Sequence, residues 1–127
     1  MQEVSPFTVA SRFNAYINDA NLDGLASMMT DDHTFIDSAG SIVSGRAAVT
    51  AAWNSFFNAF PDYRNVFARH KADGPVVAIQ GRSACSDARL DGPALWRAVT
   101  RHGKIAVWQV YEDTSENRLA LGLEQHA

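Results

Sequence analysis

Features that mark several classes of protein are missing from this sequence. A single cysteine, Cys85, excludes an intrachain disulfide and favours a reducing compartment. It lies among small residues of an expected strand, where we predict a buried, unreactive thiol. No apolar run approaches the roughly 20 residues needed to cross a bilayer, and the opening residues, MQEVSPF, lack the segments of a secretion signal. We therefore expect a cytoplasmic protein without a membrane partner.

An excess of positive charge is missing too. The chain has 11 Lys and Arg against 14 Asp and Glu, which leaves a formal net charge of -3. The basic residues are scattered rather than gathered in one stripe, so we expect no nucleic-acid partner. Neither a Gly-rich phosphate loop nor a Ser–His–Asp motif stands out.

The histidines give no metal-binding pattern. They are His33, His70, His102 and His126. Because they show no paired ligand spacing, we predict neither a metal site nor a bound cofactor. His33 follows Asp32 on an expected strand, and adjacent strand residues point to opposite faces, so the two do not make a catalytic pair. We expect His33 on the surface.

Length and apolar content fit one domain. With 127 residues, 46% of them hydrophobic, the chain can build a single sizeable core over residues 1–127. Three helices are expected, over residues 6–18, 22–29 and 45–60. The third begins after Ser44, a good N-cap, and carries the strongest apolar stripe, which includes Trp53 and Phe57. This helix should form the main ridge of the core.

The second half of the chain alternates apolar and polar residues as strands do. Tight turns at Gly74, Gly92 and Gly103 separate these strands. Strands are expected over residues 33–43, with a turn inside, and over 62–72, 76–86, 94–101 and 104–112, and a short helix over 114–123. This order predicts an α+β fold, with helices on one face of a curved, mostly antiparallel sheet. The open end of the resulting cone should form an apolar pocket.

One carboxylate stands where this pocket is expected. Asp37 follows the short apolar strand 34–36 and precedes the turn 38–41. A carboxylate at such a place can lose its water, and desolvation raises the pKa of carboxyl groups toward the range that suits proton transfer. Asp37 is therefore the main catalytic candidate. The alternative is a structural role, because Asp followed by Ser and Gly is also ordinary turn chemistry.

Four segments carry a resemblance to a known family. They read FNAYINDANLDGLASMMTDD, HTFIDSAGSIVSGRAAV, FPDYRN and HGKIAVWQVYED. In order and spacing they resemble the nuclear-transport-factor-2-like superfamily, and within it the SnoaL-like polyketide cyclases and the ketosteroid isomerases. The resemblance implies a cone-shaped, cystatin-like α+β fold with an apolar cavity, and a homodimer through the outer face of the sheet. It leaves the function open, because the superfamily includes isomerases, cyclases, epoxide hydrolases and binding modules.

Matched position by position, the resemblance covers part of a ketosteroid isomerase site. In those enzymes an aspartate moves the proton while a tyrosine and a protonated aspartate hold the substrate oxygen. The resemblance matches Asp37 to the catalytic base. The position of the tyrosine is occupied by Phe13, and the position of the second aspartate lies near Leu95 or Trp96. Tyr16, one turn after Phe13, is the substitute on the same helix face. The acid/base aspartate of SnoaL-like cyclases falls on the strand LWRAVT, which contains no carboxylate.

The remaining candidates are side chains expected to line the cavity. Its apolar walls are assigned to Phe13, Ile17, Trp53, Phe57 and Trp108. Arg82 or Arg97, if either faces inward, would favour an anionic or carbonyl-containing ligand. We therefore predict that the partner is a small apolar or carbonyl-containing molecule.

Three functions stay open on these residues. The first is a cofactor-independent isomerase or cyclase in which Asp37 moves a proton next to a carbonyl. The second is a non-catalytic ligand-binding or assembly protein, which the missing oxyanion partners favour. The third is an epoxide hydrolase-like enzyme that uses Arg89 and Asp91, although a solvated pair beside the Gly92 turn is the simpler interpretation.

The terminal hairpin leads to a prediction about assembly. Trp96, Trp108, Val110 and Tyr111 give it apolar surface, and a sheet with one face on helices needs cover on the other. We predict a two-fold homodimer through this sheet. Light scattering at micromolar concentration should return about twice 13.9 kDa. A monomer mass that persists as the concentration rises would contradict the prediction.

Overall fold

The computed structural model describes residues 4–124, so His126 lies outside the described range. The helices are α1 (Pro6–Asn18), α2 (Leu22–Ser27), α3 (Arg46–Ala59) and α4 (Ser115–Ala120). The strands are β1 (Met29–Ile36), β2 (Ile42–Ser44), β3 (Arg64–Asp73), β4 (Val76–Ala84), β5 (Gly92–Arg101) and β6 (Lys104–Glu112). A short 3-10 helix, η1 (Ala88–Leu90), precedes β5.

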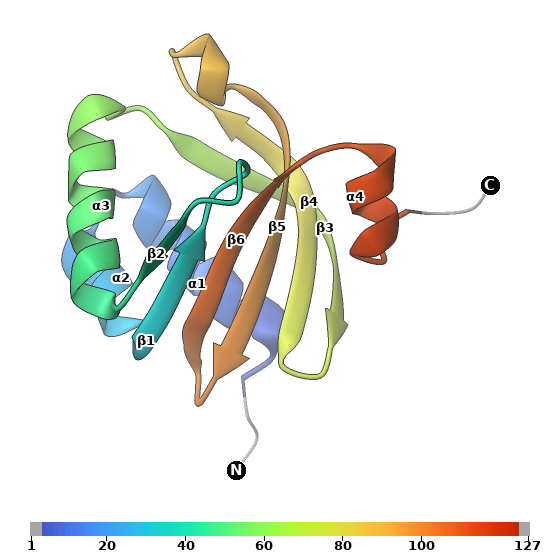
Figure 1. Cartoon of the computed structure of the whole chain (residues 1–127), viewed down its shortest axis with the longest axis horizontal. Helices are drawn as coiled ribbons and strands as arrows, with labels where there is room; N and C mark the ends of the chain where they lie inside the picture. Colours follow the sequence, from blue (N-terminus) through green and yellow to red (C-terminus); the bar gives the residue numbers. More distant parts are fainter. Residues whose placement is uncertain (1–3, 125–127) are drawn as a thin grey trace.

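The strands form one curved sheet in the order β2-β1-β6-β5-β4-β3 (Figure 1). β1 and β6 run parallel, and the other neighbouring pairs are antiparallel. The pairing skips Ala68 in β3 and Ala106 in β6, and bulges of this kind bend and twist a sheet. Gly81 lies beside the first bulge, where a Cβ would come within 2.0 Å of the Val66 carbonyl oxygen. The predicted curved, mostly antiparallel α+β sheet is confirmed.

The main core lies between the helices and the inner face of the sheet. Phe13 and Ile17 of α1 are fully buried, because a spacing of four residues puts them on one helix face. They share this core with Trp96 and Trp108, which are 0% and 1% exposed. α3 covers the β1–β2 side of the same face, whereas α4 lies across the sheet from α1 (Figure 1).

Trp96 and Trp108 point inward, so they do not belong to the exposed surface from which the dimer was predicted. Trp96, Trp108 and Val110 belong to the inner face, because Trp96 pairs in register with Val110 and both tryptophans are buried under the helices. Tyr111 does lie on the outer face, in a small cluster with Leu123. Leu121 and Leu123, which follow α4, therefore cover part of the outer face. The homodimer stays a prediction.

Several local expectations are also corrected. β1 begins at Met29, earlier than predicted, because α2 is only six residues long. The N-cap of α3 is Gly45, with a φ of 94°, since Ser44 still belongs to β2. Cys85 follows the end of β4 and is partly exposed rather than buried in a strand. The predicted C-terminal helix is confirmed, and Thr114 caps it.

His33 is fully buried, which corrects the surface position expected for it. Its Nδ1 lies 2.7 Å from the carbonyl oxygen of Ile105, so Nδ1 carries the proton and donates, while Nε2 has no partner among residues 4–124. Burial lowers the pKa of His33, and this effect outweighs the opposing effects of the Ile105 bond and the nearby Asp32 carboxylate. The folded protein therefore holds His33 neutral.

This burial predicts a loss of stability in mild acid. Below the usual histidine pKa of 6.5, the unfolded chain binds a proton at residue 33 that the folded chain does not, so the free energy of unfolding should fall as the pH drops from about 7 to 5. His33→Asn keeps a donor near Nδ1 but cannot titrate. It should flatten this dependence and lower stability at pH 7 by about 1–3 kcal/mol.

Urea titrations at several pH values measure both effects. The control is His102→Asn, on the exposed β5–β6 turn, which should keep the wild-type dependence on pH. Identical pH dependence in wild type and His33→Asn would show that His33 is not the group responsible.

Candidate functional site

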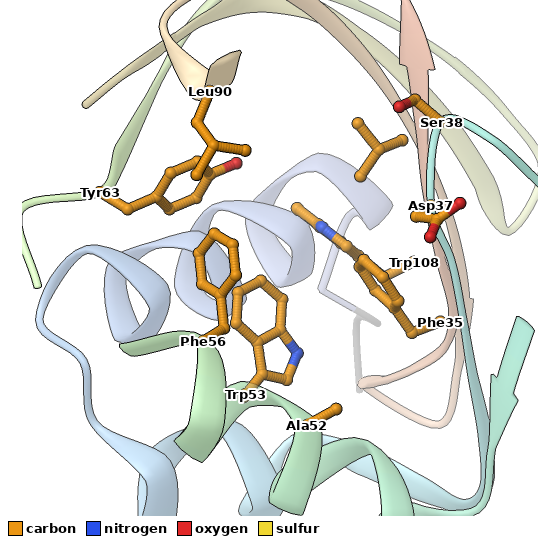
Figure 2. Close-up of a pocket in the computed structure, with 10 residues that line it drawn as sticks. Phe35, Asp37, Ser38, Ala52, Trp53, Phe56, Tyr63, Leu90 and Trp108 are labelled. Carbon is orange, nitrogen blue, oxygen red and sulfur yellow. The ribbon is translucent and has the colours of Figure 1, made fainter. Parts of the chain in front are cut away.

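A pocket lies between α3, the end of β1 and the C-terminal half of β6 (Figure 2). Its volume is about 290 Å³, near the lower end of the range for small-molecule sites. The lining residues are Phe35, Asp37, Ser38, Ala52, Trp53, Phe56, Tyr63, Leu90, Trp108 and Val110. Most of them are apolar, so removal of apolar surface from water would supply most of the binding free energy of a ligand.

Aromatic side chains hold the walls of this pocket in place. Trp53 and Phe56 come from consecutive turns of α3 and meet edge to face, with ring centroids 5.6 Å apart. Phe56 meets Tyr63 in the same way at 4.8 Å, and Phe35 of β1 meets Trp53 at 5.7 Å. Edge-to-face contacts restrict how each ring can turn. The cavity between these rings therefore has a defined shape.

Asp37 lies at the edge of the pocket, directly after the last residue of β1. Its Oδ1 accepts hydrogen bonds of 2.9 Å from the backbone amides of Ala39 and Ser41, and its own amide donates to the Ser41 carbonyl. The turn thus anchors one carboxylate oxygen and leaves Oδ2 without a hydrogen bond from the described residues. A carboxylate held in this way can take a proton from a molecule in the pocket.

Ser38, Tyr63 and Trp108 also bring polar groups to the cavity. Figure 2 shows the hydroxyl of Tyr63 and the indole nitrogen of Trp108 turned toward it. Burial raises the pKa of Tyr63, so its hydroxyl stays protonated at neutral pH. The N–H of Trp108 is a donor only. The indole N–H of Trp53 is enclosed by the fold and has no hydrogen-bond partner among residues 4–124.

The structure brings three of the predicted site residues, Asp37, Trp53 and Trp108, to one pocket. The other predicted wall residues are buried in the core behind it: Phe13, Ile17 and Phe57. Phe57 stacks on Trp53 with centroids 5.4 Å apart, and Phe13 contacts Trp108 at 4.9 Å. They support the lining instead of forming it, so their predicted contact with a ligand is corrected.

Tyr16, Arg82 and Arg97 lie away from the pocket, which corrects their predicted placement. The Tyr16 ring packs over Gly24 of α2, so closely that a Cβ on Gly24 would come within 2.3 Å of it. Arg82 points outward and pairs with Asp91 at 3.5 Å, and Arg97 borders α4 on the outer face. For the two arginines the reason is strand phase, because a shift of one residue exchanges the two faces of a strand.

Sequence reasoning missed seven of the ten lining residues. The missed residues include Phe35, Phe56, Tyr63, Leu90 and Val110. Val110 could have been found, since it lies two residues after Trp108 on the same strand face. Phe56 belongs to the apolar stripe of α3, which the sequence predicts to be core rather than pocket lining. Leu90 sits in η1, and no periodic pattern predicts where such a short segment places its side chain.

A larger hollow, of about 1190 Å³, lies at the opposite ends of the strands, beside the turns at Pro75 and Gly103. Exposed turns and the surface ion pair of Arg101 with Asp32 border it, so we assign the site to the smaller, apolar pocket. Within residues 4–124, no group of three His, Cys, Asp or Glu side chains could hold a metal ion. The helices in this range are all too short or too polar to cross a membrane.

Comparison with protein families decides where this chain belongs. Residues 10–108 match the SnoaL-like domain. The chain is a member of the SnoaL-like domain family. The match runs from α1 to β6 and includes Asp37, Trp53 and Trp108. Among curated proteins, none matches the sequence.

Solved structures share the fold of this SnoaL-like domain at low sequence identity. A polyketide cyclase candidate from Sinorhizobium meliloti gives a TM-score of 0.73 at 14% identity, over 81% of this chain and 93% of its own. A protein with a ketosteroid isomerase-like fold from Catenulispora acidiphila, in complex with trimethylamine, gives 0.71 at 18%, over 95% and 96%. An LEH-like epoxide hydrolase from M. tuberculosis gives 0.74 at 16%, over 91% and 88%. Cystatin-fold and NTF2-like proteins also match, which confirms the predicted fold.

The position of Ala52 gives a test of the pocket. Ala51 and Ala52 are both exposed on α3, but only Ala52 lines the pocket. Ala52→Leu should fill the pocket and raise the dissociation constant of naphthalene at least about tenfold. Ala51→Leu should leave binding unchanged, and leucine is a good helix former at both positions. Isothermal titration calorimetry measures the binding. Equal affinity in both variants and wild type would place the ligand elsewhere.

Proposed function

We propose that this SnoaL-like domain binds a small, largely apolar carbonyl compound and moves a proton on the carbon next to the carbonyl, with Asp37 as the base. The observation that carries the proposal is the position of Asp37. Its carboxylate lines an apolar pocket, and backbone amides anchor one of its oxygens. A base for such a reaction needs this combination of fixed position and apolar surroundings.

The proposed step is a transfer of one proton. Asp37 takes a proton from the carbon, the electron pair of the broken C–H bond forms a C=C bond, and the carbonyl oxygen becomes an enolate oxygen. The indole N–H of Trp108, which faces the cavity in Figure 2, is the donor in place to hold that oxygen. Return of the proton to another carbon gives isomerisation. Attack of the enolate on a second carbonyl carbon restores the first carbonyl and leaves an alkoxide, which takes the proton back from Asp37, and this gives cyclisation.

Relatives of the fold support this class of reaction. The similar structures include a polyketide cyclase candidate and a ketosteroid isomerase-like protein. Ketosteroid isomerases use an aspartate as the base beside an apolar site, which agrees with the position of Asp37 in this pocket. At these sequence identities the likeness extends to the fold alone, so the residues of this chain must carry the argument.

A non-catalytic ligand-binding protein is the second candidate. One observation favours it: the oxygen of Asp37 that accepts two backbone hydrogen bonds has a structural use that needs no chemistry. The resemblance also places the two oxyanion-holding residues of ketosteroid isomerases on Phe13 and near Leu95 or Trp96, which are all buried and carry no hydroxyl or carboxyl group. An epoxide hydrolase has less support, because Arg89 pairs with Asp87 at the surface, where its side chain is 80% exposed.

Replacement of Asp37 by asparagine separates the two candidates. Asp37→Asn keeps an oxygen that can accept from Ala39 and Ser41 but removes the base. Deuterium exchange at the carbon next to the carbonyl of 2-tetralone, followed by NMR, should be faster than in buffer with wild type and equal to buffer with the variant. The affinity for 2-tetralone should stay within about twofold, and stability should fall by about 1 kcal/mol.

The control for this experiment is Asp31→Asn, an exposed carboxylate on β1 that pairs with Arg46 at 3.0 Å. It should exchange deuterium as the wild type does. Wild-type protein that binds 2-tetralone without accelerating exchange would rule out the catalytic proposal and favour the binding protein.

A further inference from the structure

A chain of side-chain hydrogen bonds connects α1 to the wall of the pocket. Asn14 and Asn65 bind each other, with Asn14 Nδ2 donating to Asn65 O at 3.2 Å and Asn65 Nδ2 donating to Asn14 Oδ1 at 3.1 Å. Ser83 Oγ lies 2.7 Å from Asn65 Oδ1, and Tyr63 Oη lies 3.2 Å from Ser83 Oγ. Asn14, Asn65 and Ser83 are buried. The chain of bonds ends at Tyr63, which lines the pocket.

A backbone carbonyl fixes the direction of each bond in this chain. Asn65 O can only accept, so the Asn14 atom that faces it is the amide nitrogen, and the Asn14 oxygen faces the Asn65 side chain. That oxygen needs a donor, which places Nδ2 of Asn65 beside it and leaves Asn65 Oδ1 for Ser83. Ser83 therefore donates its one proton to Asn65. The proton in the Tyr63–Ser83 bond then comes from Tyr63.

The Tyr63 hydroxyl therefore presents its lone pairs to the pocket, because its O–H bond points to Ser83. A phenol hydroxyl has one donor and can also accept, and Ser83 uses the donor. The oxygen of Tyr63 points toward the cavity in Figure 2, so its remaining hydrogen-bonding capacity toward a ligand is that of an acceptor. Burial raises the pKa of Tyr63, which keeps the proton on the oxygen at neutral pH.

We propose that Tyr63 selects ligands that carry a hydroxyl or N–H donor, so that the substrate is a hydroxylated, apolar carbonyl compound. Its hydroxyl would donate to Tyr63, and its carbonyl would accept from Trp108, the donor on the facing wall (Figure 2). The carbonyl part rests on the proposed function, whereas the hydroxyl part depends only on the pocket. A buried polar group left unpaired by the wrong ligand discriminates strongly against that ligand.

Three molecules of similar shape test this selectivity: naphthalene, 2-naphthol and 2-naphthaldehyde. Wild type should bind 2-naphthol about three- to tenfold more tightly than naphthalene, as one hydrogen bond allows. Tyr63→Phe should abolish this preference and leave the affinity for naphthalene unchanged. Asp37→Asn should keep the preference. Calorimetric titration with each molecule measures all of these affinities.

Ser83→Ala tests the direction of the network. Without Ser83 as an acceptor, the O–H of Tyr63 can turn to the ligand and donate, so the affinity for 2-naphthaldehyde relative to naphthalene should rise about threefold or more. A merely structural role of Ser83 predicts no such gain. If Ser83→Ala does not fold, the comparison of Tyr63→Phe with wild type still decides the proposal.

The outcomes separate this proposal from the proposed function. If wild type shows no preference for 2-naphthol over naphthalene, the proposed role of Tyr63 is overturned. The same holds if Tyr63→Phe keeps the preference. A preference lost in Asp37→Asn but kept in Tyr63→Phe assigns the hydroxyl to Asp37 and also overturns it. If wild type binds none of the three molecules, the pocket is not a ligand site, and the proposed function fails together with this inference.

Discussion

Incomplete cover of the inner face of the sheet is the constraint on which the rest of this structure depends. α1 packs on β3, β4, β5 and β6, whereas α3 meets β1 and β2. Two bulges bend the sheet between these helices, and two straight helices cannot cover a curved surface without a gap. The pocket is this gap, and its aromatic walls are the core side chains that border it. The few polar groups in the pocket therefore determine which polar groups a ligand must carry.

The curvature of the sheet also explains how Asp37 can be both a turn residue and a catalytic candidate, two roles that the sequence left as alternatives. β1 must end at the rim of the curved sheet, and the chain must then reverse into β2 through residues 37–41. An aspartate closes such a turn by accepting backbone amides, which is what Oδ1 does. Because the turn stands at the rim, the carboxylate that closes it also lines the pocket. A structural role and a chemical role do not exclude each other here.

The sequence was sufficient for the order of elements and for the positions of Asp37 and Trp53, because these follow from helical spacing, caps and turns. It was not sufficient for the faces of the strands. Ile105 and Trp108 are three residues apart, so strict alternation would put them on opposite faces, yet the bulge at Ala106 places both inside. Arg82 and Arg97 lie on strands that pair with each other without a bulge, so their error has another source: alternation separates the two faces of a strand but does not say which face turns inward. The same uncertainty misplaced His33 and the surface expected to form the dimer.

The direction of the Asn14–Tyr63 network also limits what chemistry the pocket can support. Ketosteroid isomerases hold the enolate oxygen with a tyrosine and a protonated aspartate, both donors. Here Tyr63 donates its proton to Ser83, so the donors left along the pocket are the indole N–H of Trp108 and the hydroxyl of Ser38. Loss of one oxyanion donor typically costs a factor of about 10²–10³ in rate. If the pocket moves a proton as we propose, a site without the tyrosine and aspartate donors of those enzymes would suit substrates whose C–H bond is already acidic, such as a carbon between two carbonyl groups.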